Sequence, residues 1–213
     1  MRQNDSETFR IAVLGASGRT GRAVVDAAAR HGAHVTAVVR RPGVVPPGAG
    51  LTEVVVLEPA APGALDAALT GHDAVISALG PRGRGPTTVC TDLVASAIDS
   101  MTRTGVRRLL VVSAHAAAES RDRSPYARTV WALVGDKMRD KESMEALVRA
   151  SDLDWTVVRP PGLSDGPPRP RYRTGADLRP GLTSTLRRAD LADFLVREAR
   201  AGEHVRRAVG IAA

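Results

Sequence analysis

The feature that most constrains this chain is a glycine-rich segment, Gly15-Ala16-Ser17-Gly18-Arg19-Thr20-Gly21, which lies between an apolar run and a stretch with helical character. The apolar run is Phe9–Leu14, and the helical stretch is Arg22–Arg30. In such a segment one glycine permits a tight turn, a second lets the backbone approach a phosphate, and a third lets the helix pack closely on the strand. The free amides at the helix start then face an anion along a favourable dipole. The segment predicts a loop that holds the pyrophosphate of a dinucleotide.

The next apolar segment, His34–Val39, ends in two arginines, Arg40 and Arg41. A dinucleotide site that prefers NAD usually places Asp or Glu near this point, where the carboxylate accepts hydrogen bonds from the ribose hydroxyls. Two guanidinium groups instead match a 2′-phosphate, which they can bind through paired hydrogen bonds. The alternative interpretation is a solvated surface pair at a strand end. The residues favour NADP(H) over NAD(H) as the cofactor.

The length and cysteine content bound the class of protein. With 213 residues, the chain is long enough for one domain with a substantial core. It has no uninterrupted apolar stretch long enough to span a membrane. Residues 1–8 are polar, and we expect a tail there rather than an export signal, with the domain covering residues 9–213. Cys90 is the only cysteine, which excludes an internal disulfide and fits a reducing compartment, so we expect a cytoplasmic protein.

The formal net charge of +7 raises the possibility of a nucleic-acid partner. However, the arginines are scattered along the chain rather than gathered on one helix, and there are only two residues each of Trp, Tyr and Phe for base stacking. The same charge suits small anionic ligands. Neither nucleic acid nor a membrane is expected as a partner.

Apolar runs alternate with helical stretches from end to end, which is typical of an α/β fold. We predict a single Rossmann-like domain with a doubly wound, all-parallel sheet and helices on both faces. The expected strands are Arg10–Leu14, His34–Val39, Glu53–Leu57, Ala74–Ser77, Arg108–Ser113 and Trp155–Arg159. The expected helices are Arg22–Arg30, Thr88–Met101, Asp136–Ala150 and Asp190–Ala199, the last with Asp190 as its N-cap.

Loops rich in proline and glycine interrupt this rhythm. We expect the substrate-side loops to be residues 81–86, 114–126 and 160–181, because each follows a predicted strand. In open α/β sheets, the loops at the carboxyl ends of the strands form the binding crevice. These loops are therefore expected to form the walls of the site.

Several further segments complete a family pattern. They are Gly15–Gly21, Val39-Arg40, Gly71–Gly80, Pro86–Val89, Gly105–Arg108 leading to Ser113, Glu145–Ser151 and Asp154–Pro161. With these segments the chain resembles the atypical short-chain dehydrogenase/reductase group with NmrA-like, NAD(P)-binding domains. Within that group it is most similar to the biliverdin reductase B/flavin reductase branch. The resemblance extends from Phe9 to Ala199, and one departure is Glu58-Pro59, where many relatives carry Asp followed by an aliphatic residue near the adenine.

The resemblance implies a role for each matching segment. Residues Gly15–Gly21 would hold the pyrophosphate, and Arg40 the adenosine phosphate. The residues Ala78, Leu79 and Gly80 would pass under the cofactor. Ser113 would lie beside the nicotinamide, and Pro160, Pro161, Gly162 and Leu163 would close over the nicotinamide side.

The chain lacks one catalytic arrangement. Conventional short-chain dehydrogenases use a Tyr with a Lys four positions later, so that the phenol gives the proton and the ammonium lowers its pKa. Here Val130 follows Tyr126, and Ala176 follows Tyr172, at that spacing. Hydride transfer by this chain would rely on positioning, with a proton from another group or from solvent. Flavins and quinones fit that chemistry, because they need less acid catalysis than an isolated ketone.

Three residues are candidates for a catalytic helper. Ser113 closes a predicted strand and could donate a hydrogen bond to an acceptor oxygen, or could bond only to local backbone. His115 could donate a proton near neutral pH, or could simply be solvent-exposed. Lys141 precedes Glu145 by four residues, a spacing that favours either a cofactor or substrate contact or an ordinary surface ion pair.

The leading hypothesis is an NADPH-dependent reductase of a flavin, a quinone or a similar conjugated acceptor, acting as a monomer or small homo-oligomer. A non-catalytic NADP(H) redox sensor with a protein partner is the first alternative. A natural-product ketoreductase, epimerase or cyclase is the second. The row Arg169, Arg171 and Arg173 would suit its planar anionic substrate, or is simply solvated loop charge. No metal site is expected, because His31 and His34 have no converging carboxylate or thiolate.

Overall fold

The computed structural model describes residues 8–81, 83, 85–169, 172–176, 178–181 and 183–213. Its strands are β1 (Arg10–Leu14), β2 (His34–Val39), β3 (Leu51–Val55), β4 (Ala74–Ser77), β5 (Arg108–Val112), β6 (Asp154–Arg159), β7 (Gly162–Ser164), β8 (Arg173–Gly175), β9 (Thr185–Arg187) and β10 (Arg207–Ala212). Its helices are α1 (Arg19–Arg30), α2 (Asp66–Leu69), α3 (Val89–Thr104), α4 (Pro125–Ala150) and α5 (Arg188–Ala201), with a 3₁₀ turn, η1, at Ala118–Ser120. Within these ranges, no helix is both long and apolar enough to cross a membrane.

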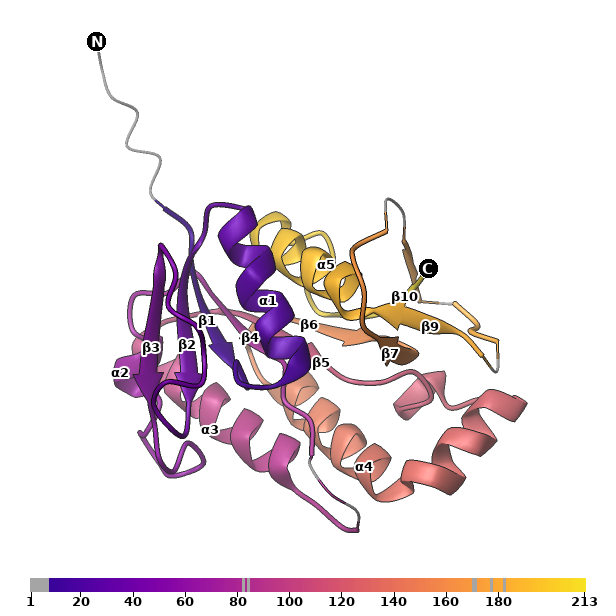
Figure 1. The fold of residues 1–213 in the computed structure, drawn as a ribbon. Coiled ribbons are helices and arrows are strands. Elements are labelled where there is room, and N and C mark those ends of the chain that lie inside the picture. Colours follow the sequence, from indigo (N-terminus) through magenta and orange to yellow (C-terminus); the bar gives the residue numbers. More distant parts are fainter. Residues whose placement is uncertain (1–7, 82, 84, 170–171, 177, 182) are drawn as a thin grey trace.

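The central sheet has the strand order β3-β2-β1-β4-β5-β6-β10-β8. Helices α1 and α5 lie side by side over one face of this sheet, and α3 and α4 cover the other (Figure 1). Each face therefore has its own apolar core. The first core contains the inward side chains of α1 and α5, and the second contains those of α3 and α4. Strand β5 is buried along its whole length between them, as its unbroken apolar run predicts.

The structure confirms the Rossmann-like α/β fold but corrects the expectation of an all-parallel sheet. Strands β1 to β6 and β10 pair in parallel, whereas β8 runs antiparallel to β10 at the sheet edge. Strand β10 was not expected at all. Its sequence, Arg207–Ala212, contains Gly210 between its only two β-branched residues, so that it lacks the β-branched run that marks the other strands. Strand β3 also begins two residues earlier than predicted, at Leu51.

Helix α4 is longer than its sequence predicts, because it begins at Pro125 instead of Asp136. Ser124 caps it by accepting a hydrogen bond from the amide of Ala127, and Pro125 occupies the first turn. The two halves meet at Val134, whose backbone angles are not helical. The last two residues of the predicted loop 114–126 therefore belong to helix α4. The predicted loop 160–181 likewise contains β7 and β8.

The end helices show two differences from the sequence prediction. Helix α1 begins at Arg19, inside the glycine-rich segment, with Gly18 as its N-cap. Helix α5 begins at Arg188 with Arg187 as its N-cap, so the assignment of that role to Asp190 was wrong. The side chain of Asp190 instead points to another segment, where its Oδ1 accepts a hydrogen bond from the amide of Arg169 at 2.7 Å.

Candidate functional site

A cavity of about 690 Å³ lies at the carboxyl ends of β1, β2 and β4 and beside the first turns of α3. The carboxyl ends of parallel strands meet at one edge of the sheet, which is where open α/β folds bind nucleotides. The glycine-rich loop, the turn after β3 and the start of α3 complete its walls. The lining residues are Leu14, Gly15, Ser17, Gly18, Val38, Val39, Arg40, Val56, Leu57, Glu58, Pro59, Ala60, Ala61, Ala78, Leu79, Gly80, Val89, Asp92 and Leu93.

The geometry of the glycine-rich loop fits a bound pyrophosphate. Gly15 has a φ of +78°, which L side chains rarely adopt, and an added Cβ there would lie 3.1 Å from the carbonyl oxygen of Ala78. The amide of Gly18 donates to the carbonyl of Gly15 at 2.9 Å and closes the turn. Helix α1 then starts with its free amides beside the cavity. A backbone this tightly turned leaves the phosphate position open, and a helix N-terminus there favours an anion.

Seven of the seventeen predicted cofactor-binding residues line this cavity. Gly15, Ser17, Gly18, Arg40, Ala78, Leu79 and Gly80 line it. Ala16 is instead buried in the core, and Gly21 packs against the loop. Arg19 reaches across the edge of the sheet to Asp165, with 3.2 Å between Nη1 and Oδ2. Thr20 and the exposed Arg41 are not part of the lining.

Ser113 lies directly after β5 and is tied to a buried network. Its hydroxyl donates to Oε1 of Glu145 on α4, with 2.5 Å between the oxygens. Arg159, at the end of β6, donates to both carboxylate oxygens of Glu145, at 3.0 Å from Nε and 2.5 Å from Nη2. Ser113, Glu145 and Arg159 are all buried. The network fixes the hydroxyl of Ser113 at the carboxyl edge of the sheet. Because this hydroxyl donates its proton to Glu145, the lone pairs of Ser113 Oγ remain available to accept a hydrogen bond from another group.

Glu119, in the 3₁₀ turn, extends this network toward the surface. Its carboxylate accepts a hydrogen bond from Nη2 of Arg159 at 2.6 Å and another from Arg149. Burial opposes its ionisation, but the hydrogen bonds and charges of these arginines lower the pKa of Glu119 to about 2. The two carboxylates therefore balance the buried guanidinium of Arg159.

Lys141 is buried and occupies the space between the ends of two strands. Its ammonium donates to the carbonyl of Leu79 after β4 at 2.9 Å and to that of Val112 in β5 at 2.6 Å. The alternative of a surface ion pair with Glu145 is wrong, because both side chains are buried and each has other partners. Two of the three ammonium protons thus connect the ends of β4 and β5. Through its bond to Leu79, Lys141 holds the segment Ala78–Gly80, which lines the cavity, in place.

His115 follows Ser113 by two residues and is also buried, not solvent-exposed. Its amide donates to the carbonyl of Pro160 at 2.8 Å, and its ring meets that of Tyr126 edge-on with 5.5 Å between centroids. Burial lowers the pKa of His115, opposed by the charge of Asp122. The imidazole is therefore neutral at pH 7, and it can offer a hydrogen bond but not an imidazolium proton.

The segment that follows β6 was predicted to close over the nicotinamide side of the cofactor. Pro160 and Pro161 are buried, and the Pro160 carbonyl holds His115 as described above. Gly162 and Leu163 belong to β7, which pairs in parallel with β9. Whether these residues close over a nicotinamide stays a prediction, and their position beside His115 is compatible with it.

Both tyrosines have environments opposite to those of a catalytic phenol. Burial raises the pKa of Tyr126. Burial and the carboxylate of Asp193, which accepts the Tyr172 hydroxyl at 3.1 Å, raise the pKa of Tyr172 to about 12. A Tyr acid of a short-chain dehydrogenase needs a lowered pKa. Neither phenol provides that chemistry.

Sequence reasoning missed three parts of the site. The turn at residues 56–61 and the first turn of α3 line the cavity, although only Glu58-Pro59 was singled out. Glu145 and Arg159 were not assigned a role, since nothing in their local sequence shows that they meet Ser113. The spacing of Lys141 and Glu145, which puts both on one face of α4, was the available signal.

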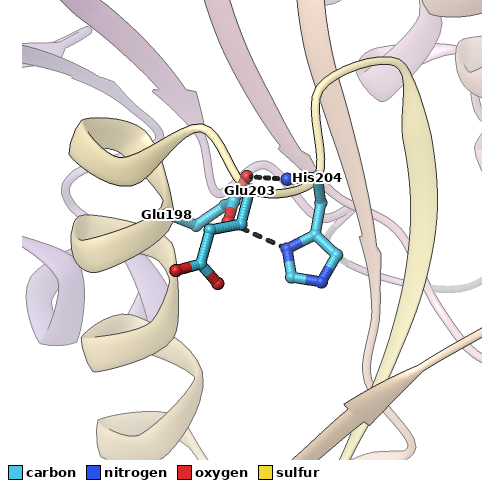
Figure 2. Close-up of side chains that lie close together, drawn as sticks. All are labelled: Glu198, Glu203 and His204. Atoms are coloured by element: carbon cyan, nitrogen blue, oxygen red, sulfur yellow. Dashed lines mark hydrogen bonds and ion pairs between the residues drawn. The ribbon is translucent and has the colours of Figure 1, made fainter.

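A second polar cluster lies at the opposite edge of the sheet, where Glu198, Glu203 and His204 offer ligand atoms within 4.8 Å of one another (Figure 2). The carboxylate of Glu198 already accepts hydrogen bonds from Arg108 at 2.7 Å, from the amide of His204 at 2.8 Å and from Nδ1 of His204 at 2.9 Å. These contacts join the end of α5 to the starts of β5 and β10. We interpret the cluster as a structural one.

The chain matches the NAD(P)H-binding family over residues 15–201. An oxidoreductase from Lactococcus lactis has a TM-score of 0.83 at 15% identity, over 96% of this chain and 90% of that one. A protein from Burkholderia pseudomallei has a TM-score of 0.77 at 27% identity, over 97% and 100%. An anaerobillin reductase from Escherichia coli O157:H7 has a TM-score of 0.77 at 20% identity, over 95% and 96%. The chain therefore belongs to the NAD(P)H-binding family.

Proposed function

We propose that this chain is an NADPH-dependent reductase that delivers a hydride to a flavin, a quinone or a similar conjugated acceptor. The observation that carries the proposal is the cavity at the carboxyl edge, which brings the glycine-rich loop and Arg40 together. The similarity to the Escherichia coli neighbour, an anaerobillin reductase, is compatible with it. Hydride transfer to such an acceptor does not require a Tyr/Lys pair.

The preference for NADPH rests on the end of β2. Arg40 lines the cavity where the adenosine ribose would lie, and its guanidinium can pair with a 2′-phosphate. Glu58, from the turn after β3, also lines the cavity and supplies a carboxylate toward the adenine side. The two side chains can thus recognise different parts of the same nucleotide.

The chemistry follows from what the residues at the carboxyl edge can do. NADPH, when bound, supplies the hydride. Ser113 is fixed by Glu145 and can accept a hydrogen bond, while neutral His115 stands two residues away in a buried position. Neither residue supplies a readily released proton near pH 7. We therefore infer that the chain orients the reactants, and that the proton comes from solvent.

The test is NADPH oxidation, followed by absorbance, with FMN, riboflavin and menadione as acceptors. Arg40→Ala is expected to weaken NADPH binding by roughly tenfold or more, because a charge-assisted contact is lost, and to leave NADH binding nearly unchanged. Arg41→Ala is the matched control, since that exposed arginine does not line the cavity.

The other outcomes separate the alternatives. Tight NADPH binding with no oxidation of any acceptor would contradict the reductase and favour the redox sensor. Equal losses in the Arg40 and Arg41 variants would contradict recognition of the 2′-phosphate by Arg40. Turnover of an isolated ketone, abolished by Ser113→Ala, would favour the ketoreductase.

A further inference from the structure

A second cavity, of about 480 Å³, lies on the same edge of the sheet as the cofactor cavity. Pro161, which follows β6, and Ala212, the last residue of β10, both line it. Because β6 and β10 are parallel neighbours, these two residues mark the carboxyl edge. The cofactor cavity opens over β1, β2 and β4, and Ser113 lies between the two cavities at the end of β5. The second cavity is therefore on the side where an acceptor would meet the reactive end of the cofactor.

This second cavity is basic. Arg169, Arg173 and Arg179 line it, together with the hydroxyl side chains of Ser184 and Thr185. Among the described residues, its lining contains no Asp or Glu side chain, and none of the three guanidinium groups forms an ion pair. Three cations with adjacent hydroxyl donors form a binding surface for an oxyanion.

The second cavity also faces the catalytic edge electrostatically. The pKa of Asp122 is lowered, first by hydrogen bonds from Ser124 and to a smaller extent by the charge of Arg179. The same carboxylate acts on the pKa of His115. The charge of Asp122 therefore interacts both with Arg179, in the basic cavity, and with His115, after β5.

Two of the three arginines are anchored to regular structure. Arg173 begins β8, where it pairs with Ala212 of β10. The backbone of Arg169 is held by the buried carboxylate of Asp190, whose Oδ1 accepts its amide at 2.7 Å. The backbones of Arg169 and Arg173 are therefore held in place, which limits the backbone ordering that ligand binding would require.

We propose that this basic cavity binds an anionic group of the acceptor, a phosphate or a carboxylate, while the conjugated ring reaches past Pro161 to the edge beside Ser113. The inference rests on the proposed reductase function and specifies its substrate class: anionic conjugated compounds are preferred over neutral ones.

FMN and riboflavin test this directly, because they share one ring system and differ in the phosphate. We expect kcat/KM for FMN to exceed that for riboflavin by roughly tenfold or more, mainly through KM. Arg173→Gln and Arg179→Gln should each raise the KM for FMN and leave the KM for riboflavin and NADPH unchanged. Carboxymethylflavin distinguishes a carboxylate from a phosphate. Arg30→Gln, on the exposed end of α1, controls for the loss of one charge.

Binding is measured in parallel, by quenching of flavin fluorescence on the NADP⁺-loaded protein. If neither flavin oxidises NADPH but FMN binds more tightly than riboflavin in an Arg179-dependent way, the basic cavity stands and the reductase proposal fails. Equal binding and equal kinetics for the two flavins would overturn the basic cavity even if both are reduced. Equal losses for both flavins in the arginine variants would overturn it as well.

Discussion

Gly21 occupies a position where any side chain would meet backbone. A Cβ added there would lie 2.1 Å from the carbonyl oxygen of Gly15 and 2.8 Å from Cα of Ala16. Neither atom can move without opening the glycine-rich turn. The third glycine of the motif therefore sets the distance between α1 and the loop that holds the cofactor.

We expect Gly21→Ala to lower the free energy of unfolding by about 1–3 kcal/mol or more, because the methyl group forces backbone apart in a packed region. NADPH binding should weaken as well, since the turn must widen. Urea unfolding and NADPH titration measure the two effects. Gly48→Ala is the control, as a Cβ at Gly48 meets nothing within 4 Å. If Gly21→Ala were as stable as the wild type, the close contact between a Cβ at this position and the carbonyl of Gly15 would not exist in solution.

The same glycine illustrates what the sequence can predict at this scale. The spacing of Gly15, Gly18 and Gly21 indicates the turn and the close packing, because both depend on local backbone sterics. The partners of Ser113 could not be predicted, since Glu145 and Arg159 come from distant segments. Local chemistry is readable from the sequence, and a buried network of long-range contacts is not.

At the scale of elements, α4 connects the ends of three strands. Lys141 bonds to the segment after β4 and to β5, and Glu145 bonds to Ser113 after β5 and to Arg159 at the end of β6. The carbonyls of Leu79 and Val112 and the buried side chains of Ser113 and Arg159 all need partners at this edge. The helix supplies them from one face, where residues four apart are neighbours.

Lys141→Met should therefore leave two carbonyls without a partner and lower the free energy of unfolding by about 1–3 kcal/mol. Lys137→Met, one turn earlier on the same helix and only half-buried, should have little effect. Chemical denaturation of the two variants makes the comparison. Unchanged stability of Lys141→Met combined with lost turnover would instead mark Lys141 as a catalytic residue.

The elements also show why some predictions failed. The strands β1, β2 and β4 have the predicted bounds, because their β-branched runs are buried on both faces. The first half of α4 was missed, since its apolar residues do not follow the periodicity of a core helix: Leu133 and Val134 are exposed, and the backbone of Val134 is not helical. Strand β10 was missed because its pairing with β6, and not its composition, makes it a strand.

For the whole molecule, acid should act through carboxylates that are ion-paired or hydrogen-bonded in the folded state. The pKa of Glu119 is lowered from 4.5 to about 2, and those of Asp66 and Asp122 are lowered by hydrogen bonds, from Arg103 and Ser124 respectively. A group whose pKa is lower in the folded state stabilises it fully above the unfolded pKa, and this contribution is lost as the pH falls through the folded value.

We therefore expect the free energy of unfolding to fall as the pH is lowered from about 4.5 toward about 2, where Glu119 becomes protonated. Glu119→Gln should flatten this part of the curve. Urea denaturation at a series of pH values measures it, with Glu203→Gln, an exposed residue at the opposite edge, as the control. An unchanged acid slope in Glu119→Gln would mean that the ion pairs with Arg159 and Arg149 are not maintained in solution.

The two cavities are built from different kinds of structure, and this has a consequence for how such proteins diversify. The cofactor cavity depends on close backbone packing around the glycines, where few substitutions can be accepted. The basic cavity is formed largely by residues between Pro161 and Thr185, most of which lie outside the long strands. Mutations there can accumulate without disturbing the nucleotide site. If the basic cavity binds the acceptor as proposed, substitutions there would change acceptor preference and leave the coenzyme requirement unchanged.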